Sequence, residues 1–426
     1  MTLSLRTDRS LIRGAASSTR YVLATISAPE APPRADRLPV NVALVLDRSG
    51  SMAGERKFDL ARRAAEQAIH MLSSEDRFTL VVYDEMIDVL VASSLATPDA
   101  KRRAVEALSA IRPRGSTDLC SGWLRGCEGI AACLEENMVV RALLLTDGLA
   151  NHGETDREKL ALHARELRQR GIATSTFGVG EDFDERLLRD MAREGGGHFY
   201  FIDSPAQIAD ILTSELGEAL ETVVRRAVLQ ISLPQGVNAK PLNPLRHTRI
   251  RDDNELRIEL GDLASAQEVR VVIRATFPRG ELGEMLALRG QLSGQQGAVG
   301  EAAEVSWRYA DHLANDRQER DRVVDREVAR IYASMARNDA SEFNRGGDFD
   351  QARRAIERTI DRIRRYAGDD AEIGAIWAEL QDEMPRWVRE MGPRDRKVMF
   401  SVAESVLFDR EVDGKARKRP SRSYKP

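Results

Sequence analysis

A run of apolar residues without alternation, residues 40–52 (VNVALVLDRSGSM), constrains the fold more than any other stretch of this chain. An unbroken Val, Ala and Leu run is typical of a strand buried on both faces, as in the centre of a parallel sheet. Asp47, Ser49 and Ser51 follow at every second position where the strand ends. Open α/β sheets place their ligands at that edge, and three oxygen donors in one turn suit Mg²⁺ better than zinc or copper. The stretch therefore predicts a metal site beside a central strand.

Residues 39–225 alternate between strand and helix patterns. Such alternation predicts a doubly wound, mostly parallel, Rossmann-like α/β sheet with helices on both faces. The expected strands are residues 42–46, 78–84, 87–91, 139–146, 172–178 and 198–201, and the expected helices are residues 57–72, 98–111, 119–134, 156–170, 185–193 and 206–224. A short turn precedes residues 87–91, so we expect this strand to be an antiparallel edge strand.

The segments on either side of this unit show the two-residue alternation of antiparallel strands. The expected strands are residues 19–29, 226–233, 255–260, 268–277, 286–292 and 304–309. We therefore predict a split β-sandwich, with residues 1–38 supplying its first strands and residues 226–312 the remainder. The α/β domain of residues 39–225 is inserted between these two parts.

The last part of the chain is predicted to be an α-helical domain, residues 313–412. Apolar stripes at helical spacing cover residues 324–335, 349–363 and 373–384, and residues 397–408 predict a fourth helix. Pro385 is expected to kink or end the third helix. Residues 413–426 are basic and are predicted to form a disordered tail.

Three segments of the α/β part carry a resemblance to a known family. DRSGSM at residues 47–52, GSTD at residues 115–118 and LLLTDG at residues 143–148 resemble the metal-ion-dependent adhesion site of von Willebrand factor type A domains. Such domains occur in integrins and in many bacterial proteins. The resemblance implies that Mg²⁺, or alternatively Mn²⁺ or Ca²⁺, is held directly or through water, with one coordination position open. The ligands that it implies are Asp47, Ser49, Ser51, Thr117 and Asp147.

The open position implies a function in binding rather than catalysis. An Asp or Glu side chain of a partner protein can complete the shell, because neutral hydroxyl ligands leave positive charge on the ion. We expect a non-catalytic protein–protein interaction module or scaffold, whose partner is an ATPase, a kinase, a phosphatase or another copy of the chain. A phosphatase-like metal-dependent hydrolase is the alternative enzyme, but residue 49 is Ser where a second carboxylate would be needed. A self-assembling structural protein is a further alternative.

Composition narrows the location and the partners. The net charge of −4 gives no reason to expect nucleic acid, although residues 415–425 carry only positive charges. Cys120, Cys127 and Cys133 lack metal-binding spacing, so we expect reduced thiols in a cytoplasmic protein. The first residues lack the apolar core of a secretory signal, and no apolar run is long enough to predict a membrane span. Asp118 is expected to cap the helix that follows it.

Overall fold

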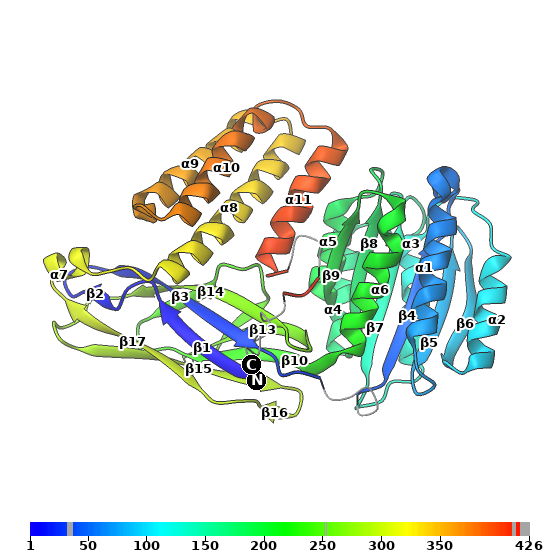
Figure 1. Cartoon of the computed structure of the whole chain (residues 1–426), viewed down its shortest axis with the longest axis horizontal. Helices are drawn as coiled ribbons and strands as arrows, with labels where there is room; N and C mark the ends of the chain where they lie inside the picture. Colours follow the sequence, from blue (N-terminus) through cyan, green and yellow to red (C-terminus); the bar gives the residue numbers. More distant parts are fainter. Residues whose placement is uncertain (32–36, 251, 253, 411–414, 418–426) are drawn as a thin grey trace, which may run out of the picture. The chain divides into compact units, whose positions relative to one another are not determined.

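The computed structural model describes residues 1–31, 37–250, 252, 254–410 and 415–417 (Figure 1). The chain forms two compact units. One unit is residues 32–222, and the other combines residues 1–31 with residues 223–426. Among the described residues, no helix is both long and apolar enough to cross a membrane.

The unit of residues 32–222 is built on a six-stranded sheet in the order β6-β5-β4-β7-β8-β9. Its strands are β4 (Val40–Asp47), β5 (Arg77–Tyr83), β6 (Ile87–Leu95), β7 (Val139–Thr146), β8 (Ala173–Val179) and β9 (Gly196–Ile202). β4 pairs in parallel with β5 and β7, and every residue of β4 is buried, as the unbroken apolar run predicts. β6 is the antiparallel edge strand, which confirms the sequence prediction.

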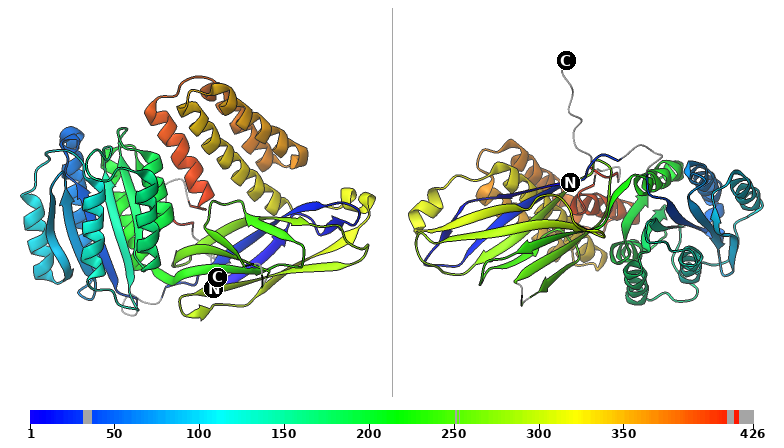
Figure 2. Two further views of the ribbon diagram at one scale, coloured as in Figure 1. Left: turned by 180° about the vertical axis from the view of Figure 1, so that it is seen from behind. Right: turned by 90° about the horizontal axis from the view of Figure 1, so that it is seen from below.

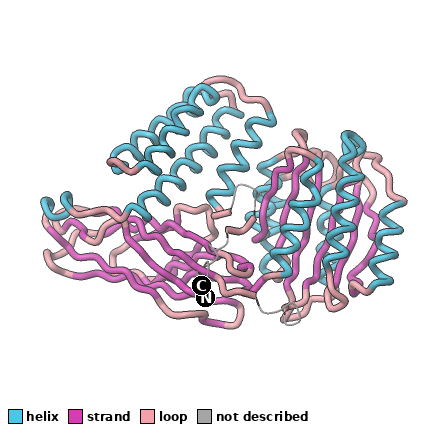
Figure 3. The backbone as a smooth tube through the Cα atoms, in the orientation of Figure 1, coloured by secondary structure: helices cyan, strands magenta, loops and turns pink. Residues whose placement is uncertain are grey.

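Helices cover both faces of this sheet (Figures 2 and 3). They are η2 (Gly50–Arg56), α1 (Lys57–Met71), α2 (Pro98–Ser109), α3 (Leu119–Ala131), α4 (Arg157–Gln169), α5 (Glu185–Gly195), η3 (Pro205–Gln207) and α6 (Ile208–Leu220). Two separate apolar clusters line the sheet: α1, α2 and α6 contribute to one, and α3, α4 and α5 contribute to the other. This is the doubly wound arrangement that the alternation predicted.

The prediction that the last helix reaches residue 224 is wrong. α6 ends at Leu220, and strand β10 (Thr222–Ser232) begins two residues later. Thr222, Val223 and Val224 are β-branched, and such side chains pack better on a pleated strand than on a helix.

The second unit contains the split β-sandwich. One sheet has the order β1-β3-β14-β11, and the other has the order β12-β13-β10-β15-β17-β2, with β16 paired to β15. Besides β10, the strands are β1 (Thr2–Thr7), β2 (Leu11–Arg13), β3 (Ser18–Ser27), β11 (Asn238–Pro241), β12 (His247–Ile250), β13 (Glu255–Ala264), β14 (Glu268–Phe277), β15 (Met285–Gly294), β16 (Gly297–Ala298) and β17 (Ala303–Ala310). β3 pairs along its whole length with β14, so strands from before and after the α/β unit share one sheet, as predicted. No sequence pattern predicted β11, β12 or β16.

The helical part of the second unit packs on the sandwich. Its helices are α7 (His312–Arg317), α8 (Arg322–Arg345), α9 (Phe349–Ala367), α10 (Ala371–Trp387) and α11 (Pro393–Leu407). Val324, Val328 and Ile331 of α8 share a buried apolar cluster with Leu23 and Val272 of the sandwich. The three predicted apolar stripes thus lie on α8, α9 and α10, and Pro385 sits near the end of α10.

The predicted disordered tail needs a partial correction. Ala416 is buried and forms an isolated antiparallel bridge with Arg410, and the Arg417 carbonyl accepts a hydrogen bond from the Glu268 backbone N–H at 2.8 Å. The chain returns here to the start of β14, where these backbone groups find hydrogen-bond partners. Residues 413–414 and 418–426 of that prediction lie outside the described residues.

Candidate metal centre

The sheet order places the predicted metal ligands at a topological switch point. The chain moves from β4 outward to β5 and β6, and then returns to the other side of β4 with β7. Leu46 of β4 and Leu145 of β7 are register partners, so Asp47 and Thr146 leave the sheet side by side at its carboxyl edge. In open α/β sheets, the crevice at this point is where ligands bind.

The chain directly after β4, called the first loop here, brings the oxygen atoms of Asp47, Ser49 and Ser51 close together. The Ser49 N–H donates to Asp47 Oδ1 at 2.7 Å, which turns the chain directly after β4. Ser49 Oγ and Ser51 Oγ lie 3.1 Å apart. Asp47 and Ser49 are buried, whereas Ser51 is exposed. The three donors therefore run from the interior to the surface along one turn.

The loop after β7, called the third loop here, contacts the first loop through Asp147. Ser51 Oγ donates to Asp147 Oδ1 at 2.6 Å, and Thr146 Oγ1 donates to Asp47 Oδ2 at 2.6 Å. Lys57, at the start of α1, forms a 2.8 Å ion pair with Asp147 Oδ2. Thr146 lies within the LLLTDG motif but was not among the expected ligands, and Lys57 lies outside all three motifs. Thr146 could have been found as the neighbour of Asp147 at the strand end, but no sequence signal links Lys57 to the site.

The loop that leads into α3, called the second loop here, brings Thr117 close to these oxygen atoms. A methyl group on Gly148 would lie 3.5 Å from Ser51 Oγ and 3.6 Å from Thr117 Oγ1, so both hydroxyls border this glycine. Thr117 is buried, and its backbone N–H donates to Asn151 Oδ1 at 2.9 Å. The Gly50 N–H donates to the carbonyl of Gly115 at 3.0 Å, which ties the first loop to the second. Backbone contacts thus hold the three loops together.

The residue next to Thr117 has the role that the sequence predicted for it. Asp118 accepts a hydrogen bond from the Ser121 N–H at 3.0 Å and caps α3. Its other oxygen lies 3.3 Å from His152 Nδ1, in the loop after β7. Asp118 therefore fixes the second and third loops relative to each other.

An ion-pair network built on the buried residues Arg48 and Asp84 supports the loops. Arg48 is 4% exposed and lies 3.2 Å from Asp84 Oδ2, which Arg114 also contacts at 2.7 Å. The Arg114 N–H donates to the Arg48 carbonyl at 2.8 Å. Arg114 lies three residues before Thr117, so this network fixes the position at which the second loop begins.

The electrostatics of the centre suit a hard divalent cation. Burial raises the pKa of Asp47 to about 6, and the nearby Asp147 carboxylate contributes to the rise, while hydrogen bonds from Ser49 and Thr146 oppose it. Two carboxylates and one ammonium group leave one excess negative charge beside three neutral hydroxyls. Oxygen donors of this kind are the ligands that Mg²⁺, Mn²⁺ and Ca²⁺ prefer, so the residues present fit such an ion.

Residues 41–214 match the family model of the von Willebrand factor type A domain. The α/β unit is therefore a von Willebrand factor type A domain, which confirms the family that the loop motifs resemble. Domains of this family serve in general as interaction modules.

Related proteins match part of the chain. An uncharacterized protein of Escherichia coli (strain K12), YfbK, is 24% identical over 249 residues, which cover 57% of this chain and 43% of YfbK. The protein sll0103 of Synechocystis is 29% identical over 204 residues, covering 48% of this chain and 47% of that protein. Human inter-alpha-trypsin inhibitor heavy chain H3 is 28% identical over 166 residues, covering 38% of this chain and 18% of that protein. The aligned residues thus span less than half the length of each of these relatives.

Solved structures share the fold of nearly the whole chain. A von Willebrand factor type A protein from Catenulispora acidiphila aligns with a TM-score of 0.70 at 18% identity, covering 98% of this chain and 97% of that one. The ArnB paralog VWA2 from Sulfolobus acidocaldarius aligns with a TM-score of 0.58 at 16% identity, covering 95% and 97%. The inserted α/β domain, the sandwich and the helical part therefore occur together in other proteins.

Proposed function

We propose that this protein is a non-catalytic interaction module that binds a divalent cation and, through it, an acidic side chain of a partner protein. The ligands in this proposal are Asp47, Ser49, Ser51, Thr117 and Asp147, and Mg²⁺ is the expected ion, with Mn²⁺ or Ca²⁺ as alternatives. The observation that carries the proposal is the meeting of the three loops at the switch point, where Ser51 Oγ donates to Asp147 Oδ1 at 2.6 Å.

The charge balance explains why the partner group should be a carboxylate. The cation supplies a Lewis-acidic position for an oxygen ligand. Asp47, Asp147 and Lys57 together leave one negative charge, so a bound divalent ion makes the centre positive by one charge. The hydroxyl ligands do not alter this balance because they are neutral. An Asp or Glu side chain is the protein group that best neutralises the remainder.

Exposed groups beside the centre suggest what surrounds that carboxylate. Ser51 is exposed, and Leu149, the residue after Gly148, is 56% exposed. A large exposed apolar side chain next to a charged centre is suited to a protein surface, which offers apolar contacts around a central polar anchor. The proposed partners are an ATPase, a kinase, a phosphatase or a second copy of this chain.

The three cysteines support a cytoplasmic location as part of the proposal. Cys120, Cys127 and Cys133 are free thiols. Free thiols persist in reducing compartments, where disulfides are rare.

The first experiment measures metal and partner binding together. The chain of residues 1–426, as wild type and as Asp47→Ala, is titrated with Mg²⁺ by calorimetry and is also used to capture partner proteins in Mg²⁺ or in chelator. We expect wild type to bind one ion and to retain its partners only in Mg²⁺, and we expect Asp47→Ala to lose both. Asp59→Asn is the matched control, because Asp59 is an exposed carboxylate in the first turn of α1 and should leave both unchanged.

Two results would contradict the proposal. Partners that are retained equally in chelator and by Asp47→Ala would remove the metal from the interaction. Hydrolysis of a generic phosphoester by wild type but not by Asp47→Ala would instead favour the metal-dependent hydrolase.

A further inference from the structure

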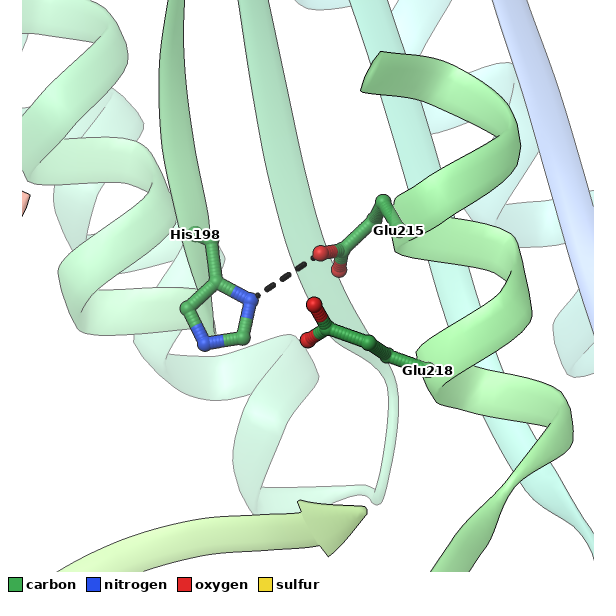
Figure 4. Close-up of side chains that lie close together, drawn as sticks. All are labelled: His198, Glu215 and Glu218. Atoms are coloured by element: carbon green, nitrogen blue, oxygen red, sulfur yellow. Dashed lines mark hydrogen bonds and ion pairs between the residues drawn. The ribbon is translucent and has the colours of Figure 1, made fainter. Parts of the chain in front are cut away.

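A second group of metal-ligating side chains lies between the edge strand β9 and helix α6. Figure 4 shows His198 of β9 facing Glu215 and Glu218 of α6. The two glutamates are three residues apart and so lie on the same face of the helix. One ligand atom from each of the three residues can be chosen so that all lie within 4.8 Å of one another. None of these residues belongs to the loops at the switch point.

Glu215 is buried, and its carboxylate is held from three strands. Oε1 accepts from Arg141 of β7 at 2.8 Å and from Ser175 of β8 at 2.6 Å. Oε2 accepts from Tyr200 of β9 at 2.5 Å and lies 3.1 Å from His198 Nδ1. A carboxylate offers about four lone-pair positions, and these four contacts use all of them. The orientation of Glu215 is therefore fixed before any ion binds.

The spacing of the ligand atoms suits zinc. Zinc bonds to nitrogen and oxygen are about 2.0–2.1 Å long, so neighbouring ligand atoms of a tetrahedral zinc are about 3.3 Å apart. The observed 3.1 Å between His198 Nδ1 and Glu215 Oε2 is close to that value. An ion bound to both atoms would replace the proton that they share. The contacts of Glu215 with Arg141, Ser175 and Tyr200 can remain and would act as supporting hydrogen bonds around a ligand.

Charge and exposure are compatible with an ion at this place. Arg141 forms a 2.8 Å ion pair with Glu215, and Glu218 brings a second carboxylate to the cluster, a group that a divalent cation attracts. The His198 side chain is 25% exposed and Glu218 is partly exposed, so one side of the cluster faces solvent. An imidazole nitrogen with two carboxylates is a ligand set typical of zinc, whereas Mg²⁺ prefers oxygen ligands alone.

We infer that His198, Glu215 and Glu218 form a second divalent-metal site, selective for Zn²⁺ over Mg²⁺, with a fourth position open to solvent. The ion would join α6 to β9, which is the last strand in the order of the six-stranded sheet. Because α6 leads into β10, zinc would stabilise the last helix of the α/β domain where the chain leaves it.

The test measures zinc binding with the first site excluded. Chelator-stripped full-length protein carrying Asp47→Ala is titrated with Zn²⁺ by calorimetry in excess Mg²⁺, and its melting temperature is measured with and without Zn²⁺. We expect one bound zinc and a higher melting temperature. Adding Glu218→Gln or His198→Asn should weaken zinc binding at least about tenfold and remove the thermal shift. Asp210→Asn is the matched control, because it removes an exposed carboxylate from the first turn of the same helix.

Either of two outcomes overturns the inference. The first is that the Asp47→Ala protein binds no zinc, and the second is that Glu218→Gln and His198→Asn bind zinc as tightly as their parent. Glu215 is left unchanged because its loss would leave Arg141 buried without its 2.8 Å ion-pair partner. Failure of the wild-type protein to bind Mg²⁺, with zinc binding intact, would contradict the proposed function alone, so the two failures are distinguishable.

Discussion

Lys57 determines the charge of the candidate metal centre, although no motif marks it. Its side chain is 11% exposed, and its ammonium group lies 2.8 Å from Asp147 Oδ2. A buried carboxylate without a partner is costly, so Lys57 supplies the countercharge when no ion is bound. The same positive charge repels an incoming cation. We therefore expect Lys57 to lower the metal affinity of the centre and to stabilise the protein in the absence of metal.

Replacing Lys57 with Met separates these two effects. In chelator, we expect Lys57→Met to lower the free energy of unfolding by about 3 kcal/mol, because Asp147 loses its ion-pair partner. With that repulsion gone, Mg²⁺ should bind at least about tenfold more tightly, which corresponds to about 1.4 kcal/mol. Calorimetry with Mg²⁺ and denaturant unfolding in chelator measure the two quantities.

The control for this prediction is Lys159→Met. Lys159 also forms a 2.8 Å ion pair, with Glu154, but its side chain is 62% exposed, so its loss should change neither quantity appreciably. Unchanged Mg²⁺ affinity in Lys57→Met would show that Asp147 is not a ligand.

At the scale of elements, α3 packs unusually closely on the sheet and carries the second loop at its start. Methyl groups added at Gly122, Gly126 and Gly129 would lie 2.4 Å from Tyr83 Cγ, 2.4 Å from Val45 Cγ2 and 2.6 Å from Thr79 Cγ2. These glycines share the face of the helix that contacts β4 and β5. Since the second loop runs directly into this helix, the depth at which α3 packs also positions Thr117.

Gly126→Ala tests this packing. Alanine favours a helix by about 1 kcal/mol over glycine, yet we expect the variant to lose about 1–3 kcal/mol of stability because its methyl group overlaps Val45 in a buried strand. The metal affinity should fall as well, since α3 must move. Gly374→Ala in α10 is the control, because no atom lies within 4 Å of an added methyl group there.

Gly126→Ala and Gly374→Ala are expected to change the free energy of unfolding in opposite directions. Gly374→Ala should stabilise the helical part by up to about 1 kcal/mol. Denaturant unfolding, followed in both variants, measures the difference. If Gly126→Ala were as stable as wild type, the contact with β4 would not determine how closely α3 packs on the sheet.

On the scale of the whole molecule, the second unit depends on pairings between distant parts of the chain. Strand β3 pairs with β14, from Ser27 with Glu268 to Ser18 with Phe277. Asp409, just after α11, accepts a hydrogen bond from the Arg270 N–H of β14 at 2.6 Å and forms a 2.8 Å ion pair with Arg417. Helix end, sandwich and tail therefore meet at one buried carboxyl group.

The pKa of Asp409 predicts a pH-dependent stability. Burial raises this pKa to about 6 from 3.8, Arg417 and the Arg270 N–H oppose the rise, and Glu327 adds to it. Because the folded state holds the proton more tightly, the stabilisation is present below about pH 4 and is lost as the pH rises through 6. The full difference is about 3 kcal/mol.

Asp409→Asn should remove this part of the pH dependence, since an amide cannot ionise and can still accept from the Arg270 N–H. The measurement is the free energy of unfolding of both proteins in chelator between pH 4 and pH 7. We expect the advantage of the variant over wild type to grow as the pH rises. Parallel curves would show that Asp409 does not titrate in this range.

Local features of the sequence determined most of the elements and the candidate ligands. The unbroken apolar run of β4 and the patterns that follow it show which residues are buried. Such a pattern predicts whether a segment is a helix or a strand, whichever segments it packs against. Because the carboxyl ends of parallel strands meet at one edge, Asp47 and Asp147 could be expected near each other from their positions at strand ends. The predicted end of α6 was wrong by four residues because helix and strand patterns overlap after Leu220.

Only the tertiary structure decided which distant groups meet. The parallel pairing of β2 with β17, the ion pair of Lys57 with Asp147 and the cluster around Glu215 each join segments that no period or motif connects. The physical reason is that periodicity records how deeply a residue is buried. The partner of a buried charge, by contrast, depends on how separate elements pack, and that is settled only by the folded chain.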